Sequence, residues 1–148
     1  MPPEDITILP EPARLIDWSA FEAARSELGA EFLRILGYFR EDGYKSVARI
    51  EHAVRAMDSV AIVIPAHTLK GEASQFGAEP LADLAERIEE AARICVEHRD
   101  TPEDLIADAA RLRPLFEASL EALERESNPL VERRRARAVD AVPGFGRG

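Results

Sequence analysis

The sequence predicts an all-α protein: an antiparallel up-down four-helix bundle with a short N-terminal capping helix and a C-terminal tail. Apolar residues recur at helical spacing in four long segments, and short connections separate these segments. No segment shows the convincing alternation of a β-strand. Aromatic residues make up only 6% of the 148 residues, whereas Ala, Leu and Glu are plentiful, which favours helices.

The predicted bundle occupies residues 17–127, between an extended N-terminal arm over residues 1–16 and a basic, flexible tail over residues 128–148. Asp17 is a candidate N-cap for a capping helix from Trp18 to about Glu27. Turn and cap residues then divide the bundle, because glycine ends helices and proline suits their first turn. The four long helices are predicted at about 30–57, 59–76, 79–98 and 101–126.

Three residues interrupt these helices. Pro65 cannot donate its amide and clashes with the preceding turn, so the second long helix is either kinked there or begins its regular part near Ile64. Pro114 lies inside the fourth long helix, where we expect a kink. Gly43 interrupts the apolar stripe of the first and is a candidate for a bend.

Charge and composition exclude several classes of protein. The net charge is −9; residues 1–129 hold 14 basic and 26 acidic residues, whereas residues 130–148 hold five arginines and two acids. An acidic body argues against nucleic-acid binding by the bundle, so none is expected, although the arginine-rich tail keeps polyanion binding open as an alternative. Neither a membrane helix, which needs ~20 apolar residues, nor a signal peptide is present, so we expect a cytoplasmic protein. Cys95, the only cysteine, is expected to be a buried thiol.

The second long helix carries the candidate site. At helical spacing its apolar residues form one stripe, and His67 and Gly71 lie on the opposite side of the helix. Lys70 lies at the edge of the stripe. An exposed imidazole is a nucleophile near neutral pH and can accept a phosphoryl group, which a nearby ammonium can stabilise. Glycine one turn away leaves room for the active site of a partner. The apolar stripe consists of Ile62, Ala66, Leu69, Ala73 and Phe76.

The motif His67-Thr68-Leu69-Lys70-Gly71, followed by Gly77 and Leu81, resembles the signature of histidine-containing phosphotransfer (HPt) domains over roughly residues 17–126. This resemblance implies a carrier, not an ATP-dependent kinase, that relays phosphoryl groups between receiver-domain aspartates of a two-component phosphorelay. It implies that His67 is the phosphoacceptor, that Lys70 supports the phosphoryl group and that Gly71 leaves room for it. No cofactor or metal is expected on this chain, and Mg²⁺ is expected in the partner receiver domain. Glu72, where a small residue is common, and Pro65 depart from the family pattern.

A docking surface is predicted around the histidine. Val60 and Ile64 share the outward side of the helix with His67, and such a row of exposed apolar residues beside a reactive group suggests a partner site. The alternative is that a neighbouring segment, such as the N-terminal arm, covers them. Ser74 and Gln75 are further candidate binding residues. The expected partners are receiver domains of a hybrid histidine kinase, a response regulator or both, bound by a monomer.

Two other functions compete with phosphotransfer. The chain could be a non-catalytic helical module that binds a receiver domain or another signalling protein without transfer. An enzyme is disfavoured because the sequence contains no P-loop, kinase-type ATP motif or nucleophile elbow. The three histidines show no metal-ligand spacing. The start at Met1 and the absence of flanking domains favour a stand-alone phosphotransfer protein over an excised kinase domain.

Overall fold

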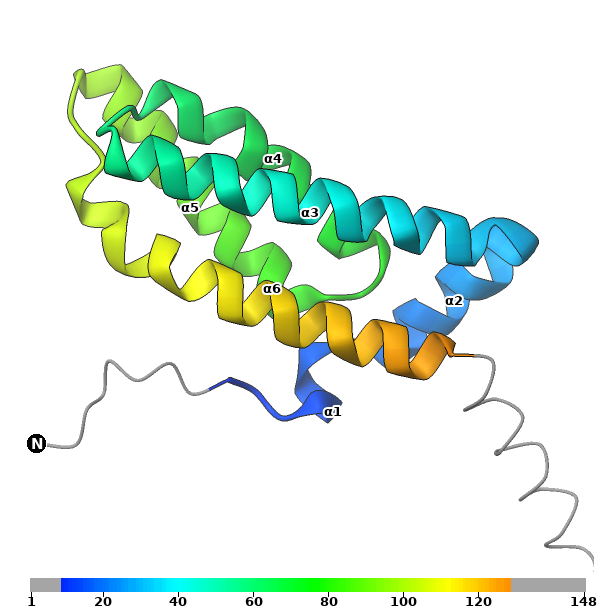
Figure 1. The fold of residues 1–148 in the computed structure, drawn as a ribbon. Helices are drawn as coiled ribbons and strands as arrows, with labels where there is room; N and C mark the ends of the chain where they lie inside the picture. Colours follow the sequence, from blue (N-terminus) through cyan, green and yellow to red (C-terminus); the bar gives the residue numbers. More distant parts are fainter. Residues whose placement is uncertain (1–8, 129–148) are drawn as a thin grey trace, which may run out of the picture.

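The structure, a computed structural model, describes residues 9–128. Within this range it is all-α, as predicted, and contains no β-strand. Two short helices, α1 (Pro12–Leu15) and α2 (Trp18–Leu28), precede the bundle, and 3₁₀ turns η1 (Gly29–Glu31) and η2 (Glu103–Leu105) lead into two of its helices. Figure 1 shows the four long helices lying along one another: α3 (Phe32–Arg55), α4 (Val60–Gln75), α5 (Glu79–His98) and α6 (Ile106–Ser127). Predictions for residues 1–8 and 129–148, including the arginine-rich tail, lie outside the described residues.

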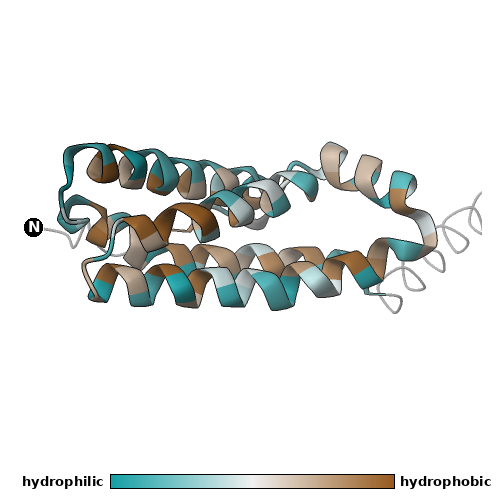
Figure 2. Cartoon of the chain, turned by 90° about the horizontal axis from the view of Figure 1, so that it is seen from above, coloured by the Kyte–Doolittle hydropathy of each residue, from teal (hydrophilic) through white to brown (hydrophobic). Residues whose placement is uncertain are grey.

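The helix α4 packs between α3 and α5, and α6 packs against α3 and α5 on the other side of the bundle. Hydrophobic and hydrophilic residues alternate along the long helices, so each buries one stripe (Figure 2). Phenylalanine rings join the helices across the core: Phe39 of α3 lies 5.4 Å from Phe76 and 5.6 Å from Phe116, measured between ring centroids. Within the described part of the chain, this packing leaves one side of α4 free of other long helices.

The N-terminal segment is built onto the bundle. Asp17 is the predicted N-cap of α2, and its Oδ1 accepts hydrogen bonds from the backbone N–H groups of Ser19 and Ala20. The prediction of an extended arm up to residue 16 is wrong for α1, which forms one helical turn. Leu15 and Ile16 at its end are buried, and this burial of apolar side chains stabilises a turn that the short sequence alone does not predict.

Two glycines are required by close packing. Gly43 lies inside an uninterrupted α3, so it breaks no helix, and a Cβ atom there would overlap the ring of Phe116. Gly77 has a φ of 77°, in the left-handed region, and a Cβ atom there would lie 2.7 Å from the carbonyl oxygen of Asp17. The backbone N–H of Asp17 donates to the carbonyl of Gly77 at 2.8 Å. The turn after α4 is therefore fixed to the start of α2.

Both internal prolines lie within continuous helices. Because α4 begins at Val60, the idea that its regular part starts near Ile64 is wrong, and Pro65 is buried within it. Likewise α6 continues through Pro114. Whether either proline kinks its helix stays a prediction. Cys95 is only half-buried, against the expectation of a buried thiol, because it lies near the end of α5, where the bundle covers less of the helix.

Candidate functional site

The outward face of α4 presents His67 to solvent. The five residues of the predicted apolar stripe are all buried, and the side chain of His67, on the opposite side, is 59% exposed. The start of α4 is held by two contacts: Asp58 Oδ1 accepts the N–H of Ala61 at 3.2 Å, and Ser59 Oγ donates to the carbonyl of Asp100 at 2.8 Å. The histidine therefore projects from a helix that is anchored at its start and buried along its inner stripe.

A carboxylate of α5 organises the site. The side chain of Glu89 is only 6% exposed, and its Oε2 atom lies 2.9 Å from Nδ1 of His67. The same oxygen accepts hydrogen bonds from Nε and Nη2 of Arg93 at 3.1 and 2.9 Å. The other oxygen, Oε1, lies 3.0 Å from Nζ of Lys70. One buried acid thus holds the histidine and two cations from two helices.

The surroundings of Glu89 keep it ionised. Burial alone would raise the pKa of this carboxyl, but hydrogen bonds from Arg93, Lys70 and His67 outweigh it and lower the pKa to about 2. At neutral pH the group is therefore a carboxylate that can only accept hydrogen bonds.

The sequence alone does not single out Glu89. Acids and arginines alternate around it on the third long helix, and such a run is usually exposed. A signal was present, because Ala82 and Ala85, both small and buried, precede Glu89 on the same side of α5 at spacings of seven and four. Small residues on this stripe let α4 approach α5 closely, which brings the acid under His67.

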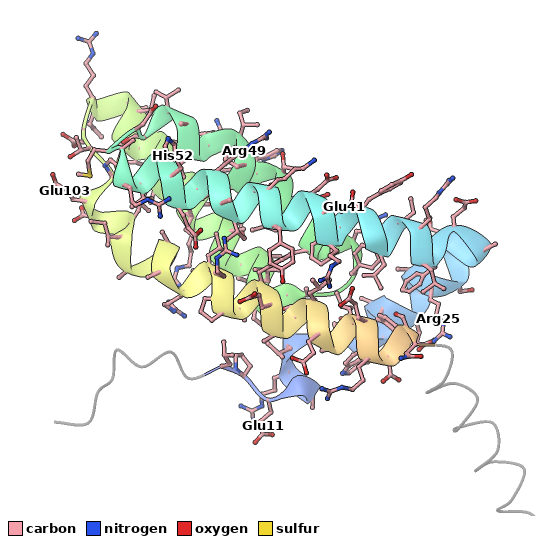
Figure 3. All side chains as sticks on the ribbon, viewed as in Figure 1. Glu11, Arg25, Glu41, Arg49, His52 and Glu103 are labelled. Atoms are coloured by element: carbon pink, nitrogen blue, oxygen red, sulfur yellow. The ribbon has the colours of Figure 1, made fainter. Side chains whose placement is uncertain are left out.

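The other predicted site residues lie on the same face of α4. Val60 and Ile64 are 67% and 69% exposed, so the alternative that another segment covers them is wrong for the described residues. Ser74 and Gln75 are also exposed, and a Cβ atom added at Gly71 would meet no described atom within 4 Å. Figure 3 labels Arg49 and His52 on α3. Together with Ala61 of α4 they line a groove on this side of the bundle.

Glu72, which departs from the family pattern, faces α3 instead of α5. Its carboxyl lies against Asp42, and among the described residues its Oε1 atom is buried without a hydrogen-bond partner. Burial, with the repulsion of Asp42 and a hydrogen bond to it, raises the pKa of Glu72 to about 7. This acid pair is separate from the cluster around Glu89.

The fold and the site define a helical-bundle protein that presents a histidine to solvent beside a lysine. The model of the Hpt domain family matches residues 34–126, and the chain belongs to that family. Hpt domains are phosphoryl carriers in phosphorelays, not kinases, and interact with receiver domains.

Among solved structures, the chain is similar to histidine-containing phosphotransfer protein B (HptB) of Pseudomonas aeruginosa PAO1. The TM-score is 0.69 at 23% sequence identity, and the match covers 77% of this chain and 95% of the other. A search of curated proteins gives no match. Within residues 9–128, no helix combines the length and apolar character needed to cross a membrane.

Proposed function

We propose that His67 accepts a phosphoryl group from the phospho-aspartate of one receiver domain and passes it to the aspartate of another. The observation that supports this function best is the 59% exposed imidazole of His67, next to Lys70, on a rigid helix of an Hpt domain. The receivers would belong to a hybrid histidine kinase, a response regulator or both, and each would supply Mg²⁺. This chain supplies the nucleophile and its surroundings.

The transfer needs only the phospho-aspartate and Mg²⁺ of the receiver and the histidine of this chain with its surroundings. A ring nitrogen of His67 forms a bond to phosphorus while the P–O bond of the acyl phosphate breaks, and the aspartate carboxylate leaves. The ammonium of Lys70 forms an ion pair with Oε1 of Glu89 at 3.0 Å, and its N–H groups can donate to the phosphoryl oxygens. Gly71 adds no side chain one turn further on, which gives the receiver room to approach.

The receiver would dock on the exposed face of α4. Val60 and Ile64 offer apolar surface that a partner can bury, and Ser74 and Gln75 offer polar groups at the other end of the helix. The chain has a net charge of −9, but Lys70 and Arg93 put positive charge next to His67. The negatively charged phospho-aspartate site of the receiver would lie there in the complex.

The test is incubation of the full chain with receivers that carry radiolabelled phospho-aspartate. Wild-type protein should acquire an acid-labile, base-stable label, as expected for a phosphohistidine. His67→Gln should abolish it. His98→Gln, which changes an exposed histidine at the end of α5, should not. Lys70→Ala should fold and reduce transfer about tenfold, since it loses a charge-assisted hydrogen bond.

Labelling of His67→Gln at the wild-type level would place the phosphoacceptor elsewhere. A wild-type chain that binds receivers but is never labelled would instead favour the non-catalytic interaction module.

A further inference from the structure

The exposed face of α4 continues onto α3 through an apolar groove. Ala61 of α4, three residues before Ile64, lines this groove together with Arg49 and His52 of α3. Three more alanines of α3 contribute their methyl groups to it, namely Ala48, Ala53 and Ala56. Because alanine side chains are small, the groove has room for an apolar side chain of a partner, and it adjoins the exposed isoleucine.

Two basic side chains border this groove on α3. Asp42 lies against Glu72 of α4, and Lys45 and Arg49 follow Asp42 by three and seven residues, so all three lie on the side of α3 that faces α4. Lys45 and Arg49 are exposed, and within residues 9–128 neither forms an ion pair. We call these two residues the basic edge. In a chain with a net charge of −9, they offer positive charge to a partner.

The opposite edge of the same face, on α5, is acidic. Glu89 contacts α4, and Glu86 and Arg93 lie on the same side of α5, three residues before it and four after it. Glu97 follows four residues later, and both Glu86 and Glu97 are exposed. The guanidinium of Arg93 is already paired with Glu89 at 2.9 Å. Beyond this pair, the face around His67 is thus acidic along α5 and basic along α3.

We propose that the basic edge and the groove that it borders select the receiver domain and set its orientation on α4. The receiver would place an apolar side chain in the groove and acidic side chains against Lys45 and Arg49. This inference rests on the proposed function and adds to it the kind of receiver surface that the chain binds.

The chemistry of the receiver favours this arrangement. A receiver that carries phospho-aspartate binds Mg²⁺, and proteins hold Mg²⁺ with carboxylates, so the surface that approaches His67 bears acidic groups. The basic edge attracts such groups, whereas the glutamates of α5 repel them. Charge therefore favours one rotation of the receiver on α4 over the others.

The groove and the charges contribute differently to binding. Exposed charges act mainly on the rate of association, and salt screens them. An apolar side chain buried in the groove instead slows dissociation, and salt affects it little. The two contributions can therefore be measured separately on the full chain.

Charge reversal tests the basic edge. In a calorimetric titration with a receiver domain that binds the wild-type chain, Arg49→Glu should weaken binding about tenfold, because acidic side chains of the receiver then meet a like charge. The loss should shrink as the salt concentration rises. Arg55→Glu is the matched control, because Arg55 is an exposed arginine of the same helix that lies near Glu51, on the α6 side. It changes the net charge equally and should bind as wild type does.

Filling the groove tests the second contribution. Ala61→Leu adds bulk where the apolar side chain of the receiver would lie, and should weaken binding about tenfold at low and at high salt. Ala110→Leu is the control, because Ala110 is an exposed alanine of α6. It should leave the affinity unchanged. Thermal unfolding checks that all four variants are folded.

Equal affinities of Arg49→Glu and Arg55→Glu would overturn the proposal, as would tighter binding by Arg49→Glu, which would indicate a basic receiver surface. Binding of Ala61→Leu at the wild-type affinity or tighter would overturn it as well. Failure of the proposed function looks different: the four variants would differ in affinity as predicted, yet no receiver would label His67.

Discussion

The glycines Gly43, Gly71 and Gly77 stand in three different surroundings. The missing side chain of Gly43 leaves space for the ring of Phe116, and Gly77 has a positive φ next to the carbonyl of Asp17. The packing of the chain therefore explains both glycines. Gly71 has neither reason, because, apart from its chain neighbours and the backbone of its own helix, no described atom lies within 4 Å of where its Cβ would be. A helical glycine costs about 1 kcal/mol relative to alanine, so its presence next to His67 points to a requirement outside the chain.

Replacement of Gly71 should therefore separate stability from function. Gly71→Ala is expected to raise the free energy of unfolding by about 1 kcal/mol, because alanine loses less conformational entropy in a helix. It should also slow phosphoryl transfer, because the added methyl group meets the incoming receiver. Urea unfolding and a receiver transfer assay measure the two effects.

Gly37 provides the matched control, since it is also helical with no described atom within 4 Å of its Cβ position, but lies on α3. Gly37→Ala should give a similar gain in stability and keep the wild-type transfer rate. A Gly71→Ala protein that transfers as fast as wild type would show that the glycine serves no partner.

At the scale of the elements, α4 is covered by α3 and α5 on its inner side, whereas its outer side is exposed among the described residues. Ile64→Glu should weaken receiver binding about tenfold, because a charge replaces an apolar side chain that the partner would bury. Stability should change by less than about 0.5 kcal/mol, since Ile64 is 69% exposed. Calorimetric titration with a receiver domain measures the affinity.

Ile106→Glu is the control, because Ile106 is an isoleucine of α6 that is 50% exposed. It should bind receivers as wild type does. Equal affinities of the two variants would move the docking surface away from α4.

The sequence sufficed for features that lie within a single helix. The bounds of α5 match the predicted 79–98, because Gly77 and Pro80 mark its start, and the apolar stripe of α4 is buried as its spacing required. Features that depend on contacts between helices were missed. The burial of Glu89 needs α4 above it, and the role of Gly43 needs Phe116 of α6. The periodicity of one helix gives no information about which side chains of neighbouring helices it will contact.

At the scale of the whole molecule, two acids shift in opposite directions and shape the dependence of stability on pH. The pKa of Glu89 is about 2 in the fold against 4.5 unfolded, so its stabilising contribution is complete above pH 4.5 and is lost as the pH falls toward 2. The pKa of Glu72 is about 7, so the fold binds a proton that the unfolded chain releases between pH 4.5 and 7. Stability falls with rising pH over that range, and the two groups together favour a maximum near pH 4.5.

Replacement of Glu72 tests the predicted fall in stability between pH 4.5 and 7 directly. Glu72→Gln should leave stability unchanged near pH 4.5 and raise it by about 1 kcal/mol above pH 7, since the neutral amide meets Asp42 without repulsion and partial exposure screens the pair. Urea unfolding across this pH range measures the difference. Asp42→Asn should also raise the free energy of unfolding above about pH 7. The double variant should gain less than the sum of the two single gains, because each single change already removes the same repulsion between residues 42 and 72. If the free energy of unfolding of Glu72→Gln changes with pH in parallel with that of the wild type, the carboxyl of Glu72 titrates alike in the folded and unfolded chain.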